Sequence, residues 1–227
     1  MRNILKNLAG QLPIDIYQRL LAYSIIKNEF PQSLGIPVLS TRHDLWNFAI
    51  QHHVNHKAKI AYMEFGVWQG ESINYFAACN ENEESIFVGL DSFEGLPENW
   101  GHMPKGTFGT NGIVPLVNDK RIHFVKGWFQ DSWDDANLLI TSTQDSDLLI
   151  HYDADLYSST LFALTKIDSF RKAYYAIFDE FTGHETRALY NYCQAFGATV
   201  EFLAKTVLDK TELPCQLLCR IMPRSCQ

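Results

Sequence analysis

Several features that mark particular protein classes are missing from this sequence. No apolar run approaches ~20 residues, so we expect no membrane span. Basic residues do not predominate: 19 Lys and Arg face 26 Asp and Glu, which gives a net charge of −7. That balance disfavours nucleic-acid binding, because phosphate neutralisation dominates such affinity. Motifs of the G-x-S-x-G, P-loop and paired C-x-x-C types are absent, which removes support for hydrolase, nucleotide-hydrolysing and dithiol chemistry.

Cysteine is sparse and widely spread. The five cysteines are an odd number without the spacing of a disulfide framework. Cys215 and Cys219 have no second pair and no neighbouring His, so we expect no zinc site. The N-terminal segment is interrupted by Gly10 and Pro13 and does not resemble a signal peptide, so the sequence predicts a cytoplasmic protein.

Short apolar runs alternate with helical stretches from residue 60 onward. Continuous apolar runs are typical of strands that are covered on both faces. Helical stretches at 70–79, 157–170 and 184–196 lie between them, so the pattern predicts an α/β protein with a mostly parallel, doubly wound sheet. Seven strands are expected, at 60–65, 85–90, 121–126, 147–152, 174–179, 199–204 and 216–221.

We expect residues 1–57 to form a helical extension that packs on a main domain at 58–227. One helix is indicated by the 3.6-residue spacing of Ile14, Tyr17, Leu20, Leu21 and Ile25. Thr41 and Asp44 resemble a capping box at the start of a second helix. The two helices are expected to cover one edge of the sheet, and self-association of the chain stays open.

A long stretch between Asp91 and Lys120 interrupts the alternation. It holds five of the 13 Gly and three of the 8 Pro, so it is not a regular element. Loops of this length are commonly functional, and the aromatic residues Phe93, Trp100 and Phe108 favour a lid over a ligand. A plain surface excursion is the alternative.

The segment after the first expected strand contains a glycine turn. Gly66 and Gly70 would let the backbone turn sharply and approach a ligand before the next helix begins. Trp68 occupies the middle position of a dinucleotide motif, where its indole would crowd a pyrophosphate, so NAD is disfavoured.

Residues after the second and third strands suggest a nucleoside site. Asp91 follows the second strand, where an acidic residue commonly accepts hydrogen bonds from ribose hydroxyls. Trp128 and Phe129 follow the third strand and could flank an adenine ring. A turn cap is the alternative for Asp91, and an ordinary core position is the alternative for the aromatic residues.

Acidic residues end the fourth and fifth strands. Asp153, Asp179 and Glu180 are expected at one edge of the sheet, where their carboxylates would repel one another unless they are protonated or bound to a cation. Hard oxygen ligands favour Mg²⁺ or Mn²⁺. The alternative is that Asp153 or Asp155 caps the following helix.

Five segments, taken in order, resemble the macrocin O-methyltransferase family of class I S-adenosylmethionine-dependent methyltransferases. They are EFGVWQGES, GLDSFEGLP, KGWFQDSW, HYDADLYSST and FDEF, within residues 60–185. The resemblance implies a Rossmann-like sheet of seven strands with the last antiparallel, S-adenosylmethionine as donor, and Mg²⁺ at the acceptor hydroxyl. The family usually has two Asp after the fifth strand, whereas this chain has Asp179 and Glu180.

The same resemblance assigns residues to the site. Cofactor-binding residues would be Glu64, Gly66, Gly70 and Ser72 at the methionine part, Asp91 at the ribose with Ser92 beside it, and Gly127, Trp128 and Phe129 near the adenine. Metal ligands would be Asp153, Asp179 and Glu180. Asp153 could also receive the proton of the acceptor hydroxyl, and His102 on the loop is a further candidate base.

The sequence therefore predicts a Mg²⁺-dependent O-methyltransferase that acts on a hydroxyl of a sugar or another small natural product. One alternative is a nucleotide-dependent oxidoreductase on a similar fold, which would bind NAD and not S-adenosylmethionine. The other is a non-catalytic methyltransferase-like binding protein, which the departure at Glu180 keeps open.

Overall fold

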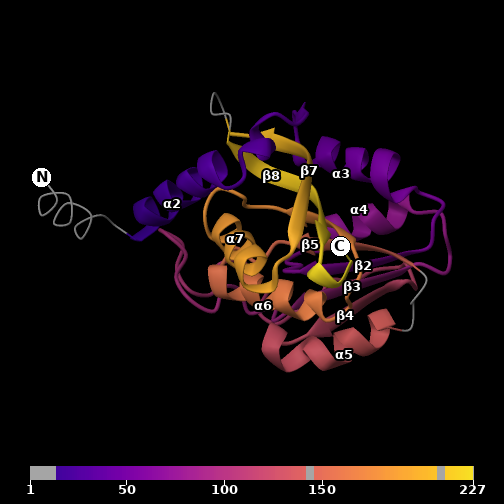
Figure 1. Cartoon of the computed structure of the whole chain (residues 1–227). Coiled ribbons are helices and arrows are strands. Elements are labelled where there is room, and N and C mark those ends of the chain that lie inside the picture. Colours follow the sequence, from indigo (N-terminus) through magenta and orange to yellow (C-terminus); the bar gives the residue numbers. More distant parts are fainter. Residues whose placement is uncertain (1–13, 142–145, 209–212, 227) are drawn as a thin grey trace, which may run out of the picture.

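A computed structural model describes residues 14–141, 146–208 and 213–226 of the chain (Figure 1). Within these residues, an eight-stranded sheet has the order β1-β7-β8-β6-β5-β2-β3-β4. The strands are β1 (Val38–Leu39), β2 (Ile60–Phe65), β3 (Ile86–Asp91), β4 (Ile122–Lys126), β5 (Asp147–Tyr152), β6 (Tyr174–Phe178), β7 (Thr199–Val207) and β8 (Pro214–Met222). Neighbouring strands run parallel except where β8 pairs with β6 and β7. The chain thus has a Rossmann-like α/β fold.

Helices cover both faces of the sheet. They are α2 (Ile14–Asn28), α3 (Arg42–Ala49), α4 (Glu71–Cys79), α5 (Phe129–Thr141), α6 (Tyr157–Asp168) and α7 (His184–Phe196). Figure 1 shows α3 and α4 on one face and α5, α6 and α7 on the other. Side chains alternate along the central strands, so Tyr62 packs in the core under α3 and α4 while Met63 packs in the core on the opposite face. None of the helices in the described ranges is both long and apolar enough to cross a membrane.

Much of the expected pattern is confirmed. The strands at 60–65 and 147–152 and the helix at 184–196 have the bounds that the sequence indicates, and the final strand is antiparallel. The capping box is also present, because Asp44 N donates to Thr41 Oγ1 at 3.1 Å and Thr41 N donates to Asp44 Oδ2 at 3.0 Å.

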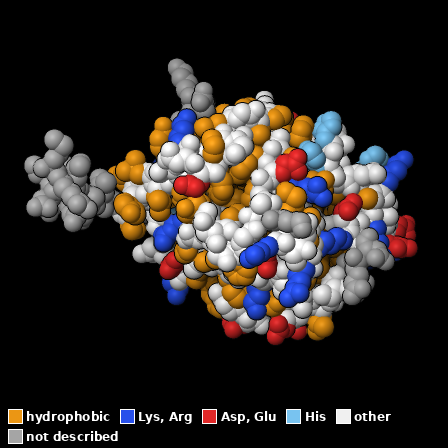
Figure 2. All heavy atoms as spheres, viewed as in Figure 1, with side chains coloured by type: hydrophobic (Ala, Val, Ile, Leu, Met, Phe, Trp, Pro, Cys, Tyr) orange, Lys and Arg blue, Asp and Glu red, His pale blue; other side chains and the backbone are white. Residues whose placement is uncertain are grey.

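The expected arrangement of the N-terminal region is partly wrong. Helix α3 packs on β1, β7 and β8 at one edge of the sheet, as expected, whereas α2 packs against α7 instead. The outermost strand at this edge is the short strand β1, which pairs with β7. The face of α2 that packs contains Ala22, Ile25 and Ile26, whereas Tyr17 and Leu20 are exposed. Figure 2 shows hydrophobic side chains gathered over this outer side of α2. Residues 1–13 of the expected extension lie outside the described residues.

Helix α3 belongs to the core rather than to a separate layer. Leu45 and Trp46 are almost fully buried and pack in the same cluster as Ile73 and Phe76 of α4. Part of the region assigned to 1–57 therefore supports the sheet directly. Self-association stays a prediction.

Candidate functional site

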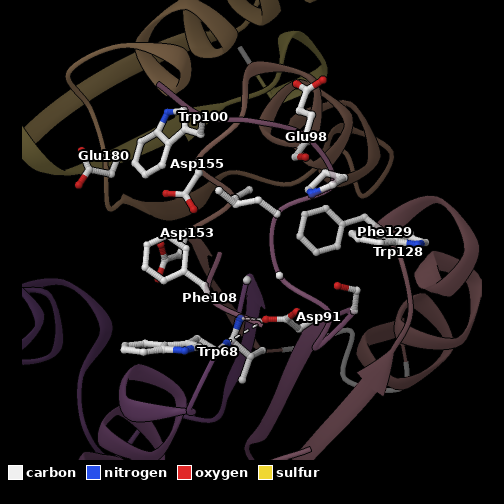
Figure 3. A pocket seen from close by; sticks show the side chains of 18 of the residues that line it. Trp68, Asp91, Glu98, Trp100, Phe108, Trp128, Phe129, Asp153, Asp155 and Glu180 are labelled. Atoms are coloured by element: carbon white, nitrogen blue, oxygen red, sulfur yellow. Dashed lines mark hydrogen bonds between the residues drawn. The ribbon is translucent and has the colours of Figure 1, made fainter. Parts of the chain in front are cut away.

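A cavity of about 680 Å³ opens at the carboxyl edge of the parallel strands. Its walls come from the residues that follow β2, β3, β4, β5 and β6, from the loop between β3 and β4, and from the start of α3. Figure 3 shows side chains from these separate segments around one space. The volume lies in the range of small-molecule sites, and the position is the one at which open α/β sheets bind ligands.

Gly66 sets how closely two strand ends approach each other beneath the cavity. It adopts a left-handed φ of 96°, and a Cβ atom added to it would lie 1.9 Å from the carbonyl oxygen of Asp153. No other residue type fits there without a shift of the backbone. Glycine is therefore needed at this position so that the backbone after β5 can pack against the turn, whether or not a ligand is bound.

The Asp91 carboxylate holds the glycine turn in place. Its Oδ2 accepts hydrogen bonds from the backbone N–H groups of Val67 and Trp68, both at 2.8 Å, and its Oδ1 accepts one from Phe93 N at 2.7 Å. Two carboxylate oxygens offer about four acceptor positions, so about one is left for a ligand hydroxyl. The turn-cap alternative and the ribose interpretation are thus compatible at this residue.

The cavity has two chemically different sides. Figure 3 shows Asp91 on the same side as Trp128 and Phe129, whereas Asp155 and Glu180 lie on the other side with Trp100. The first side combines an acceptor oxygen with aromatic surfaces, which suits a nucleoside. The second side is dominated by carboxylates.

The long loop between β3 and β4 forms part of the cavity wall, as the lid interpretation expects. Trp100 and Phe108 line the cavity, and the Phe108 ring lies edge-on to Trp68 at 5.8 Å between centroids. Phe93 does not take part, because its side chain is 1% exposed and packs against Phe124 in the core. Phe93 thereby anchors the loop while the later aromatic residues face the ligand space.

Three acids on the second side, Asp153, Asp155 and Glu180, have raised pKa values. Burial and the carboxylates of Glu180 and Asp179 raise the pKa of Asp155 to about 7. Burial and the nearby Asp179 raise the pKa of Asp153 well above its usual value, and the same two causes raise the pKa of Glu180. A cation in this space would relieve the repulsion between them.

The capping alternative for these acids is wrong. Helix α6 begins after Leu156, which makes no side-chain cap, and Tyr157 N donates instead to His184 Nδ1 at 3.1 Å. Asp155 has a left-handed φ of 54° within a tight turn in which Leu156 N donates to Ala154 O. Such conformations are uncommon for residues other than glycine and cluster at functional sites.

The acids do not form a preassembled metal centre. Within the described ranges, no group of three or more His, Cys, Asp or Glu side chains is arranged around a point that could hold a metal ion. The donor chemistry nevertheless fits a hard divalent cation, since Asp153, Asp179 and Glu180 all line the cavity. The Oδ1 atom of Asp179 is also buried without a hydrogen-bond partner among the described residues.

The structure brings most of the expected site residues together. Those that line the cavity are Gly66, Asp91, Ser92, Trp128, Phe129, Asp153, Asp179 and Glu180. Those that do not are Glu64, Gly70, Ser72, Gly127 and His102. Gly70 and Gly127 shape turns through left-handed or unusual φ angles of 80° and 155°, and His102 has an exposed side chain on the loop.

Glu64 and Ser72 form a buried network behind the cavity. Glu64 Oε1 accepts hydrogen bonds from Ser72 Oγ and, at 3.1 Å, from the hydroxyl of Tyr62, and it lies 3.0 Å from His151 Nδ1. Burial alone would lower the pKa of His151, but interaction with Asp179 and Glu64 outweighs burial and raises it to about 10.

Several cavity residues escaped the sequence reasoning. Ser158 and Ser159 lie in the segment HYDADLYSST, so that segment was a usable signal for them. Arg42 lines the cavity from α3 and forms an ion pair with Glu71, and nothing in the local sequence indicates this contact. Glu98 on the loop likewise has no local motif.

Comparisons with known proteins find structures that are similar at low sequence identity. No family model and no curated protein sequence matches the chain. One similar structure is apo CalS11, a TDP-rhamnose 3′-O-methyltransferase of calicheamicin biosynthesis, with 22% identity, coverage of 95% of this chain and 91% of that chain, and a TM-score of 0.49. Another is the O-methyltransferase TomG from Streptomyces achromogenes, involved in tomaymycin synthesis and bound to SAM, with 12% identity, coverage of 92% and 96%, and a TM-score of 0.45. These similarities are too distant to assign an activity to the chain.

Proposed function

We propose that the protein is an S-adenosylmethionine-dependent O-methyltransferase that acts on a hydroxyl of a sugar or another small natural product. The observation that carries the proposal is the shared cavity, in which a nucleoside-type side at Asp91, Trp128 and Phe129 faces a carboxylate side. The order of the five segments that resemble the macrocin O-methyltransferase family supports the same activity.

The cofactor would occupy the first side of the cavity. The remaining acceptor position of Asp91 would bind a ribose hydroxyl, and the rings of Trp128 and Phe129 would contact the adenine. The acids opposite would attract the positive charge of a sulfonium and disfavour an anionic ligand. Trp68 at the turn adds a bulky ring where a second phosphate-linked nucleotide would have to pass.

Asp153 is the residue that we assign to proton transfer. S-adenosylmethionine, when bound, would supply the methyl group for transfer to the acceptor oxygen and would leave as S-adenosylhomocysteine. Asp153 would accept the hydroxyl proton, because it lines the acid side of the cavity. The loop bearing Trp100 and Phe108 would hold the acceptor against this carboxylate and limit access of water.

We further propose that a divalent cation binds at Asp153, Asp179 and Glu180. Support comes from their shared position in the cavity, from the raised pKa values of Asp153 and Glu180, and from the unpartnered Asp179 oxygen. A bound Mg²⁺ ion would favour ionisation of a nearby hydroxyl. The side chains would have to turn toward a common point, because they are not gathered in that way here.

Calorimetric titration tests the donor. We expect S-adenosylmethionine and S-adenosylhomocysteine to bind at micromolar concentration and NAD to give no signal. Binding of NAD alone would favour the oxidoreductase alternative. Repeating the titrations with Mg²⁺ separates the cation from the cofactor, and methyl transfer that persists in excess chelator would contradict the metal site.

A single substitution tests the cofactor side. Asp91→Asn leaves one acceptor oxygen for three backbone N–H groups, so the turn loosens and the ribose contact is lost. We expect the affinity for S-adenosylhomocysteine to fall by about tenfold or more, the effect of losing a charge-assisted hydrogen bond. Asp135→Asn, at an exposed position on α5, is the matched control and should bind like the wild type. Equal affinity in both variants would mean that the nucleoside binds elsewhere.

A further inference from the structure

His151 lies near the carboxyl end of β5 and is completely buried between two carboxylates. Its Nδ1 atom is 3.0 Å from Glu64 Oε1 on β2, and its Nε2 atom is 3.9 Å from Asp179 Oδ1 just after β6. The register pairs Glu64 with His151 and His151 with Ile177, so all three polar side chains fall on the same face of adjacent strands. Of these three residues, Asp179 lines the cavity.

Aromatic rings enclose the imidazole. The ring centroids of Trp46, Phe76 and Tyr62 lie 6.0, 6.3 and 6.5 Å from that of His151. A polar ring in such surroundings is costly unless its nitrogens have partners. One nitrogen is served by Glu64 and by the Tyr62 hydroxyl, which is 3.1 Å from Nδ1.

The other nitrogen, Nε2, faces Asp179 Oδ1 without a hydrogen bond. His151 Nε2 and Asp179 Oδ1 are both buried, and neither has a hydrogen-bond partner among the described residues. Their separation of 3.9 Å exceeds a hydrogen bond of about 2.7–3.2 Å, so a small rotation of the Asp179 side chain would complete it. The large majority of buried polar atoms in proteins are hydrogen-bonded, so two unbonded atoms that face each other indicate a contact with a specific role.

We propose that His151 is a positioning residue that holds the Asp179 carboxylate in the orientation needed on the acid side of the cavity, with Glu64 fixing the imidazole from behind. The inference rests on the proposed function, because it gives Asp179 its role as a cation ligand. Groups behind a ligating carboxylate typically change metal affinity by about 10–100-fold. The cofactor side, at Asp91, lies outside this contact.

The test compares two binding equilibria in one variant. In His151→Gln we expect the affinity for Mn²⁺, titrated alone, to fall by about tenfold, while the affinity for S-adenosylhomocysteine is unchanged. If His151 had only a structural role, the substitution would lower the affinities for Mn²⁺ and S-adenosylhomocysteine together, or neither of them. The matched control is His56→Gln, because His56 also faces a carboxylate, Glu81 at 3.7 Å, but on the surface. Wild-type Mn²⁺ affinity in His151→Gln would overturn the inference, as would a parallel loss of both ligands.

Two further measurements keep the inference independent of folding and of the proposed function. If His151→Gln does not fold, Glu64→Gln removes the fixing charge and should give the same separation between Mn²⁺ and S-adenosylhomocysteine; normal Mn²⁺ binding would overturn the inference. If the wild type binds neither ligand, the proposed function fails. In that case we would measure the free energy of unfolding of His151→Gln, of Asp179→Asn and of the double variant. If the effects of the two substitutions simply add, the two side chains are not coupled and the contact is contradicted.

Discussion

The backbone conformations of two single residues determine much of the geometry of the site. Gly66 and Asp155 both have positive φ angles, of 96° and 54°, and both line the cavity in the segments that follow β2 and β5. Gly66 has no alternative, since its hydrogen points at the Asp153 carbonyl. Asp155 is instead a residue held in an unfavourable conformation with a raised pKa, a combination that a purely structural turn does not need.

Gly66→Ala should be strongly destabilising. The added methyl group would lie 1.9 Å from the carbonyl oxygen of Asp153 in a left-handed backbone, so the ends of β2 and β5 must separate. We expect the free energy of unfolding in urea to fall by about 2 kcal/mol or more. Gly35→Ala is the control, because Gly35 has a φ of −92° and nothing within 4 Å of the added atom. A loss in Gly66→Ala no larger than in this control would refute the steric argument.

Among the secondary-structure elements, α4 depends on a side chain from outside the helix. Arg121, just before β4, donates to the carbonyl oxygens of Ala77 at 2.6 Å, Asn80 at 2.8 Å and Asn82 at 2.9 Å. Its guanidinium also pairs with Asp119 at 2.6 Å. The last carbonyl groups of a helix lack intrahelical partners and carry partial negative charge, so this single cation satisfies the end of α4 and ties it to β4.

Arg121→Lys should destabilise the protein although the charge is kept. An ammonium group cannot reproduce the planar fork that reaches several carbonyl groups and the Asp119 carboxylate together. We expect a loss of about 2 kcal/mol in the free energy of unfolding, measured by thermal or urea denaturation. Arg171→Lys, at an exposed position, should cost almost nothing by comparison. An equal effect of the two substitutions would show that the fork is not needed.

For the whole molecule, burial sets the chemistry of the cysteines. Burial raises the pKa of Cys193 to about 12, that of Cys215 to about 11, and that of Cys219 well above its usual value. Cys226 is exposed near the C-terminus. These three thiols, of which Cys215 and Cys219 are buried and Cys193 is half-buried, are therefore almost fully protonated near neutral pH, and only thiolates react quickly.

Thiol labelling at pH 8 should follow this order. We expect Cys226 to react with a disulfide reagent first, and Cys193, Cys215 and Cys219 to react only slowly until urea unfolds the chain. Their slow rates should rise about tenfold per pH unit, because the pH is below each raised pKa. Peptide mapping by mass spectrometry identifies the modified residue. Equal labelling of Cys219 and Cys226 in the native protein would contradict the buried position.

How far the sequence predicts the molecule depends on whether a feature is local. The strand at 60–65 and the helix at 184–196 follow from continuous apolar runs and from spacing, which are properties of one segment. The acids after β5 and β6 were also predictable, since strand ends share one edge of the sheet. Glu64 was expected at the cofactor but lies in a buried network, because its partner His151 is set by strand register rather than by nearby residues. The two-residue strand β1 has no sequence pattern that indicates a strand, and it forms only because it pairs with β7.

The short strand β1 affects the tendency of the protein to aggregate. β1 pairs in parallel with Lys205 and Thr206 of β7, and Lys205 also binds the chain before β1, with its N–H on Pro37 O and its Nζ on Leu34 O, each at 3.0 Å. An uncovered strand is a template for pairing with another chain. The residues just before Thr41 therefore protect β7 from pairing with another chain. We expect a protein shortened to begin at Thr41 to aggregate before any loss of activity could be measured.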